Sequence, residues 1–363
     1  MHYVGVDLHK ETATFSVRDG EGRNIVTSIC STSKRDLARM FRWLPKPCEI
    51  GVEATYNWYY FVDMAARYAQ RVRLGHSLYI KGFARRHKKT DRIDAELISW
   101  LLWKAVFPEA HITSREGRRV KEKIRLWCNL VGDRTRAIAR ARAFCCRNGH
   151  VLREGLNLTT LAGIEGARRL RWGDEERDVI EDYLGEIEWL TRKISARRRM
   201  MKKMVREDED MKRLTTIPGM DVVAAFIVRA EIDDVSRFAN SARFIAYCGL
   251  APRTVSSGGK QTRAGLMKNA SHHLKWIFIQ NAATFARAHQ AAGQRWREKT
   301  KRTNATKARL EAARRLCKIT YTLLKEKRNF LETVEQKPKA AKRALPSMES
   351  QGKQFEHASP CTV

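Results

Sequence analysis

The stretch Lys88-Lys89-Thr90-Asp91-Arg92-Ile93-Asp94-Ala95 decides how the N-terminal part of this chain folds. Its two aspartates open a run whose apolar residues recur at the spacing of one helix face, namely Leu97, Ile98, Leu101 and Leu102. Thr90 is a suitable N-cap for that helix. Residues three apart leave the same side of a first turn, so both carboxylates are expected to point the same way. Taken alone, such a pair is usually an exposed helix start whose charge neighbouring cations balance.

Two further acids end short predicted strands nearer the N-terminus. Tyr3-Val4-Gly5-Val6-Asp7 and Ile50-Gly51-Val52-Glu53 are both β-branched runs whose last residue is acidic. Acids at strand ends, beside two more at a helix start, can converge on one point above a sheet. Four carboxylates suit Mg²⁺ or Mn²⁺ and suit zinc poorly. Two such ions about 3.5–4 Å apart can stabilise the attacking and leaving oxygens of phosphodiester cleavage.

The chain carries 71 Lys and Arg against 40 Asp and Glu over 363 residues, a net charge of +31. Such a balance predicts a polyanionic partner and does not bear on the fold. No apolar run approaches the roughly 18–20 residues needed to span a bilayer, and no signal peptide precedes the first strand. We therefore expect a cytoplasmic protein that binds nucleic acid, lies with the nucleoid when bound to DNA, and has no membrane partner.

The periodicity predicts four segments. Strands alternating with helices over residues 1–110 predict an α/β domain with a mixed sheet. Residues 111–210 are expected to form a connector made of a basic helix and a coiled coil, and residues 211–335 a mainly α C-terminal domain. Pro, Ser, Lys and Gln dominate residues 336–363, which predicts a disordered tail.

The first connector helix is rich in cations. Residues 114–149 carry eleven Arg and Lys at helical spacing, with few acidic neighbours to pair with. The alternative to phosphate binding is a solvated helix face. We favour sequence-independent, salt-sensitive contact with phosphates, made by Arg118, Arg119, Arg125, Arg136 and Arg140.

The second connector helix shows a heptad pattern. Its steps of three and four residues fall on Ile180, Tyr183, Ile187, Leu190, Ile194, Arg197, Met201 and Met204. This spacing predicts a coiled coil or a helical hairpin. Two alternatives stay equally open. The helix packs against the preceding basic helix of the same chain, or it packs against a second copy of the chain.

Two features of the C-terminal domain suggest phosphate contact. Ile217-Pro218-Gly219 is a turn between two predicted helices, and it either exposes amides near Gly219 to a phosphate or is a plain packing turn. Residues 249–260 are predicted to be a glycine-rich loop before a helix over residues 267–288, and a basic helix is expected over residues 299–328. The loop carries Ser256 and Ser257 among cations that offset phosphate charge, so it suits a phosphoryl-attacking serine or an ordinary phosphate-contacting linker. The flanking cations are Arg253, Lys260 and Arg263, and Lys268 beyond the loop is a further expected nucleic-acid contact.

In combination these residues resemble insertion-sequence transposases of the IS-one-ten type, the DEDD transposases understood as bridge-RNA-guided serine recombinases. Order and spacing match over roughly residues 1–330. The stretches that carry the resemblance are Gly5-Val6-Asp7, Val52-Glu53-Ala54-Thr55-Tyr56-Asn57-Trp58-Tyr59, the lysine–threonine–aspartate run 89–95, Ile217-Pro218-Gly219, residues 244–252 with Phe244 and Pro252 at their ends, and Ser257-Gly258.

The resemblance implies an RNase H-like (RuvC-like) N-terminal domain in which four acids hold Mg²⁺, or Mn²⁺ as a substitute: Asp7, Glu53, Asp91 and Asp94. It implies that Ser257 attacks DNA and forms a transient phosphoserine link, with adjacent Ser256 as the rival nucleophile. The implied partners are element-terminus DNA, target DNA, a structured noncoding guide RNA, and further copies of the chain in homodimers that pair into a tetramer. The protein would read backbone and shape while base pairing reads sequence.

Two other interpretations remain. One is a RuvC-like metal-dependent endonuclease or junction resolvase, in which water attacks the phosphate and the serine only binds it. The other is a non-catalytic scaffold for nucleic acid, in which the acids merely end a strand and begin a helix.

Overall fold

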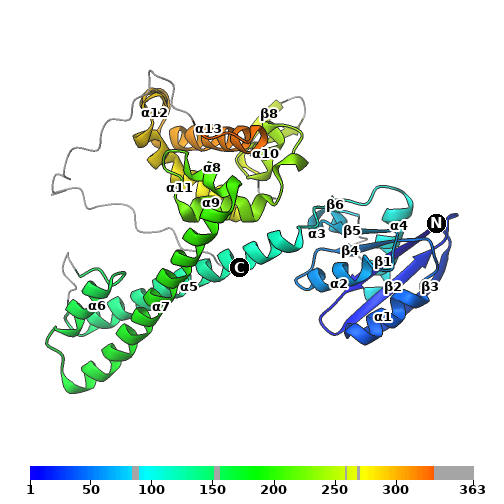
Figure 1. Cartoon of the computed structure of the whole chain (residues 1–363), viewed down its shortest axis with the longest axis horizontal. Coiled ribbons are helices and arrows are strands. Elements are labelled where there is room, and N and C mark those ends of the chain that lie inside the picture. Colours follow the sequence, from blue (N-terminus) through cyan, green and yellow to red (C-terminus); the bar gives the residue numbers. More distant parts are fainter. Residues whose placement is uncertain (84–89, 151–155, 258–259, 268–269, 331–363) are drawn as a thin grey trace. The chain divides into compact units, whose positions relative to one another are not determined.

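A computed structural model describes residues 1–83, 90–150, 156–257, 260–267 and 270–330, with the backbone alone over residues 253–264. The chain divides into two compact units, Met1–Thr113 and Ser114–Val363, and each is described by itself (Figure 1). Lys88, Lys89, Lys268 and the tail over residues 336–363 lie outside the described residues. The predicted subdivision of the second unit stays a prediction.

The first unit is built on a six-stranded sheet with strand order β3-β2-β1-β4-β5-β6. Strands β1, β4 and β5 run parallel, and the other pairs are antiparallel, so the predicted mixed α/β architecture is confirmed. The sequence did not predict the two-residue strand β6. The strands are β1 His2–Leu8, β2 Thr12–Arg18, β3 Asn24–Ser31, β4 Cys48–Glu53, β5 Arg71–Gly75 and β6 Glu109–Ala110.

One face of the sheet is covered by α1 (Lys34–Trp43) and α2 (Trp58–Ala65). Because side chains alternate along a strand, Val4, Val6 and Leu8 of β1 all enter this layer and are buried. They belong to one apolar cluster with side chains of both helices, including Phe41 and Phe61. The short helix α3 (Ser77–Lys81) follows β5.

The opposite face is covered by α4 (Asp91–Trp103), the helix predicted from the aspartate stretch. Thr90 is its N-cap, as predicted, since its side chain accepts a hydrogen bond from the Ile93 amide at 3.3 Å. The helix rests directly on the sheet because Gly5 and Gly51 pair in register on β1 and β4. A Cβ atom at Gly5 would lie 2.1 Å from the Ala95 carbonyl oxygen, so only glycine fits there.

Replacing Gly5 with Ala should therefore destabilise the first unit. The added methyl group would meet helix backbone that cannot move aside as a flexible side chain can, and overpacking of this kind costs about 1–3 kcal/mol or more. Denaturant unfolding of the variant should show a lower midpoint with an unchanged slope. Gly20→Ala is the control, because the nearest atom to its Cβ is 3.8 Å away. Equal stability of the two variants would contradict the packing of α4 described above.

The second unit is mostly helical, and its two longest helices form an antiparallel hairpin. The side chain of Arg140 in α5 contacts Glu186 in α7, and the Lys123 ammonium near the start of α5 lies 3.5 Å from the sulfur of Met204 near the end of α7. Packing within the chain, one of the two alternatives, is therefore observed. The helices are α5 Arg115–Arg147, α6 Leu161–Arg168, α7 Asp174–Glu207, α8 Glu209–Thr215, α9 Val222–Ile232, α10 Ser241–Tyr247, α11 His272–Ala288, α12 Gln290–Arg302 and α13 Ala305–Glu326, with a 3₁₀ turn at Val235–Arg237.

The predicted heptad matches the buried side of α7 only in part. Five of its positions are buried, namely Ile180, Ile187, Leu190, Ile194 and Met201. Leu184 and Val205, which the heptad omits, are also buried. The contact surface is therefore wider than a strict two-position seam, and true coiled-coil packing stays a prediction.

Three sequence expectations in the C-terminal part were wrong. The predicted glycine-rich loop is an antiparallel hairpin of β7 (Pro252–Ser257) and β8 (Lys260–Leu266). The next helix begins at His272, because the Ser271 side chain caps it by accepting from the Leu274 amide. The single basic helix expected over residues 299–328 is two helices, since Asn304 caps a new start by accepting from the Lys307 amide.

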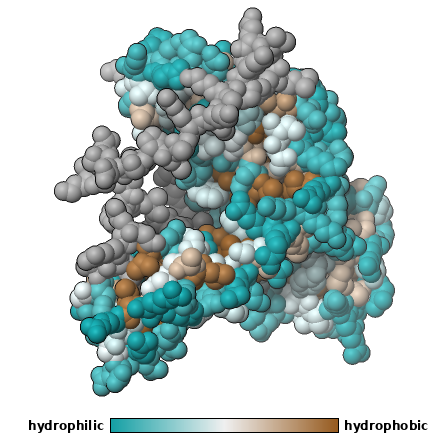
Figure 2. All heavy atoms as spheres, turned by 60° about the vertical axis from the view of Figure 1, so that its left-hand side comes forward, coloured by the Kyte–Doolittle hydropathy of each residue, from teal (hydrophilic) through white to brown (hydrophobic). Residues whose placement is uncertain are grey.

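Hydrophilic residues predominate on the described surface in the view of Figure 2, with apolar patches between them. Among the described helices, none combines the length and apolar character needed to cross a bilayer.

Candidate functional site

The sheet and α4 together carry four predicted acids to one end of the first unit. Asp7 and Glu53 follow Gly5 and Gly51 by two residues on neighbouring parallel strands. Since the side-chain period of a strand is two, both acids lie on the face that α4 covers. Asp91 and Asp94 stand in the first turn of that helix.

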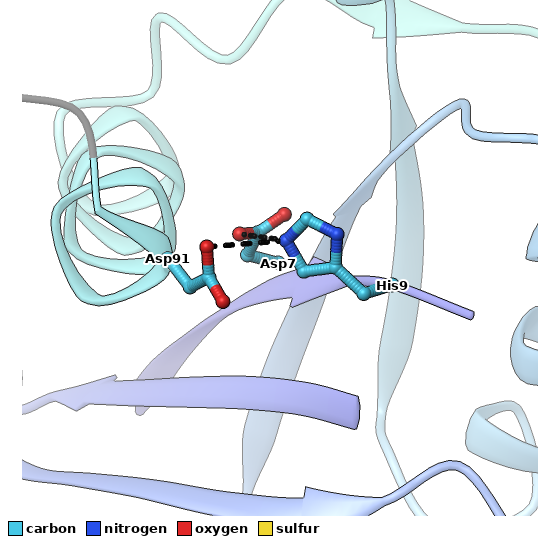
Figure 3. A group of neighbouring side chains, drawn as sticks. All are labelled: Asp7, His9 and Asp91. Atoms are coloured by element: carbon cyan, nitrogen blue, oxygen red, sulfur yellow. Dashed lines mark hydrogen bonds and ion pairs between the residues drawn. The ribbon is translucent and has the colours of Figure 1, made fainter. Parts of the chain in front are cut away.

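The closest contacts at this end involve a histidine that the sequence analysis did not select. The Nε2 atom of His9 lies 3.0 Å from Oδ2 of Asp7 and 3.3 Å from Oδ1 of Asp91 (Figure 3). One ligand atom from each of the three residues lies within 4.8 Å of the others. Asp7 is buried, whereas the side chains of His9 and Asp91 are 50% and 56% exposed. The cluster is therefore open to solvent on one side.

The electrostatics of the cluster favour a bound cation. Burial raises the pKa of Asp7, the charges of Asp94 and Asp91 add to the rise, and the attraction of His9 offsets only part of it. Asp94 shares the first turn of α4 with Asp91. Burial alone would lower the pKa of His9, but Asp7 and Asp91 outweigh that effect and raise it.

These residues fit a divalent metal ion, because a buried carboxylate with a raised pKa faces a second carboxylate and a ring nitrogen. Asp7 and Asp91 would hold the ion directly, and Asp94 and Glu53, from the start of α4 and the end of β4, are further candidate ligands. When bound, such an ion supplies Lewis acidity toward a phosphate oxygen.

His9 carried a sequence signal that was overlooked. It stands two residues after the strand-end acid Asp7, at the turn into β2, where the chain cannot carry it far from the acid. A histidine so near a predicted carboxylate ligand could have been included in the ligand set on spacing alone.

Ser257 and Ser256 occupy the last two positions of β7 in the second unit. Ser257 pairs with Lys260 and Ser256 with Gln261 across the hairpin. Thr254 pairs with Arg263, and Arg253 lies on the same strand as the serines. Their predicted roles as nucleophile and phosphate contacts remain predictions.

The expectation that the cations of α5 have few acidic partners was wrong. Arg119, Arg125, Arg136 and Arg140 are exposed, and their partners are Glu116, Glu122, Asp133 and Glu186. Exposed ion pairs contribute only about 0–1 kcal/mol, so phosphates could replace these acids at little cost. Arg118 is different, because it is buried with 7% of its surface exposed, and it is a poor candidate for phosphate contact.

The Ile-Pro-Gly turn is shaped by packing. Gly219 has a φ of +84°, and a Cβ there would lie 2.8 Å from the Phe285 amide nitrogen in α11. Both facts require glycine for structural reasons. They favour the packing alternative for this turn over a phosphate-binding one.

Two family profiles match this chain. Residues 4–145 match the DEDD transposase profile of the IS110 group. Residues 211–297 match the profile described as transposase IS116/IS110/IS902 family.

Individual relatives carry similar descriptions. The transposase for insertion sequence element IS1328 of Yersinia enterocolitica is 25% identical over 295 residues, which is 78% of this chain and 83% of that protein. A probable family 20 transposase of Pseudomonas aeruginosa is 24% identical over 287 residues, covering 78% and 84% of the two chains. The transposase for element IS1111A of Coxiella burnetii is 32% identical over 87 residues, 24% of each chain.

Together, the fold, the acid cluster and the matches to family profiles and relatives define a transposase, the class of enzyme that cuts and rejoins DNA. The chain belongs to the IS110/IS116/IS902 family of insertion-sequence transposases.

Proposed function

We propose that this transposase is an RNA-guided recombinase in which Ser257 is the nucleophile and four acids hold a divalent metal ion. The observation that carries the proposal is the register of β1 and β4, which sets Asp7 and Glu53 side by side on the face that bears Asp91 and Asp94. The strand order, three antiparallel strands followed by parallel β4 and β5, supports an RNase H-like (RuvC-like) first unit.

The proposed reaction exchanges one phosphodiester bond for another. The Ser257 hydroxyl oxygen gives up its proton to solvent or a nearby base and bonds to the scissile phosphorus. The bond from phosphorus to a deoxyribose oxygen breaks, and that oxygen leaves and takes up a proton. The reverse step, with the oxygen of a different DNA end, releases the serine. Because each step conserves one phosphodiester, ATP is not required. Asp7, Glu53, Asp91 and Asp94 would hold Mg²⁺ or Mn²⁺ at the phosphate.

The proposed partners follow from the charge and from the family. A net charge of +31 and the exposed arginines of α5 suit a long phosphate backbone. Element-terminus DNA, target DNA and a guide RNA from the element would share these surfaces. Homodimers that pair into a tetramer would bring the required DNA ends together.

The two other interpretations give different products on a denaturing gel. Purified protein, terminus DNA, flanking noncoding RNA and Mg²⁺ should yield a slow-migrating, protease-sensitive protein–DNA adduct if the serine attacks. Free cleaved ends without any adduct would indicate hydrolysis by a RuvC-like nuclease. Unchanged DNA in the presence of RNA and both termini would indicate a scaffold.

The basic helix gives a separate test of nucleic-acid binding. Arg119 is 74% exposed, so Arg119→Ala should weaken RNA binding without unfolding the protein. If it contacts a phosphate, the slope of log K against log salt should fall by about one. Arg23→Ala is the control, because Arg23 is 73% exposed and is also ion-paired, with Asp19 and Glu21, but lies in the first unit. Equal losses from both variants would show a general effect of net charge instead of a contact at α5.

A further inference from the structure

The position of His9 between two proposed metal ligands needs an explanation of its own. Its Nε2 atom lies 3.0 Å and 3.3 Å from oxygens of Asp7 and Asp91. Two ligands at right angles around an ion, each about 2.1 Å from it, lie about 3.0 Å apart. The two nitrogen–oxygen distances are thus those of neighbouring ligands of one ion, and Figure 3 shows the imidazole directed at both carboxylates.

The backbone of His9 is held on both sides. Its amide donates to the Thr12 carbonyl oxygen at 2.9 Å, which closes the turn between β1 and β2. Its carbonyl oxygen accepts from the Asn57 side-chain amide at 2.7 Å, and the Asn57 oxygen accepts in turn from the Thr55 hydroxyl. The ring therefore projects from an anchored position, as a preorganised ligand should.

We propose that His9 is a further protein ligand of the metal, beside the carboxylates, and makes the site prefer a transition-metal dication such as Mn²⁺ over Mg²⁺. This inference rests on the proposed metal site. Mg²⁺ prefers an all-oxygen shell. An imidazole nitrogen is typical of transition ions, whereas Mg²⁺ keeps oxygen ligands and water, so the nitrogen should add more affinity for Mn²⁺, a transition dication, than for Mg²⁺.

The competing explanation is that His9 acts as a counter-ion that the metal displaces. The two explanations predict opposite signs for His9→Ala. Loss of a ligand weakens Mn²⁺ binding, whereas loss of a competing positive charge strengthens the binding of both ions.

The test is calorimetric titration of the full chain, without nucleic acid, with Mn²⁺ and separately with Mg²⁺. His9→Ala should weaken Mn²⁺ binding at least about tenfold and change Mg²⁺ binding much less. Lys10→Ala is the control, because it removes an exposed neighbouring cation that cannot be a ligand. Tighter or unchanged binding of Mn²⁺ by His9→Ala would overturn the proposal. Pulsed electron paramagnetic resonance should also show nitrogen coupled to bound Mn²⁺ in the wild type and no such coupling in His9→Ala.

Asp7→Asn separates failure of this inference from failure of the metal site. If Asp7→Asn abolishes binding of both ions while His9→Ala binds Mn²⁺ normally, only the role of His9 is wrong. If Asp7→Asn binds both ions as the wild type does, the proposed metal site is wrong, and the inference fails with it.

Discussion

Ser257→Ala is expected to abolish the covalent protein–DNA adduct and all strand exchange. Loss of a serine nucleophile can cost a factor on the order of 10⁶ in rate, so recombination products should fall below detection. RNA binding and thermal stability should stay unchanged, because the substitution removes one hydroxyl from the end of a short hairpin. The measurement is a denaturing gel of labelled terminus DNA incubated with protein, guide RNA and Mg²⁺ or Mn²⁺.

Ser256→Ala is the matched control, since it removes the same group from the preceding position of β7. It should keep the adduct. Loss of the adduct in Ser256→Ala alone would make Ser256 the nucleophile. Cleavage that survives in Ser257→Ala, with free ends and no adduct, would refute serine attack and support the hydrolytic nuclease.

The second large effect is expected from Asp91→Asn. The Asp91 side chain is 56% exposed and lies in the first turn of α4, so the fold should tolerate the asparagine side chain there. The substitution would weaken metal binding. The charge stabilisation that a metal gives a phosphoryl transition state is worth several kcal/mol, so cleavage should slow at least about 10²-fold. Metal-dependent cleavage should be lost while salt-sensitive RNA binding persists.

Glu96→Gln serves as the control for Asp91→Asn. It neutralises an acid of the same helix that pairs with Arg92 at 2.9 Å, and it should cleave DNA at nearly the wild-type rate. If Asp91→Asn lowers the unfolding temperature strongly, Asp91 has a structural role and the loss of cleavage says nothing about metal.

The sequence predicted the first unit well because its signals are local. β-branched runs that end in acids predicted β1 and β4, and a threonine before two aspartates predicted the cap of α4. The convergence of the acids depends on the parallel pairing of β1 with β4. The sequence is compatible with that pairing but does not predict it. His9 was missed because exposed histidines are scattered through the chain and none has a zinc-type spacing.

In the second unit, the glycines of the hairpin and the cap between the last two helices gave ambiguous sequence signals. Residues 249–260 looked like a loop because of their glycines, although two glycines between runs with β-branched residues are also a hairpin signal. The break at Asn304 was overlooked because basic residues continue on both sides of it. Burial of Arg118 follows from the helices packed around α5, which no local pattern reveals.

The contact between α4 and Gly5 also bears on how this enzyme can diverge. At that point helix backbone meets strand backbone, so the spacing between the elements that carry Asp7 and Asp91 does not depend on the volume of any side chain there. Substitutions in the apolar layer on the opposite face can change packing without resetting that spacing. The core of the first unit can therefore drift in sequence while the carboxylates keep their separation, provided that the glycine remains.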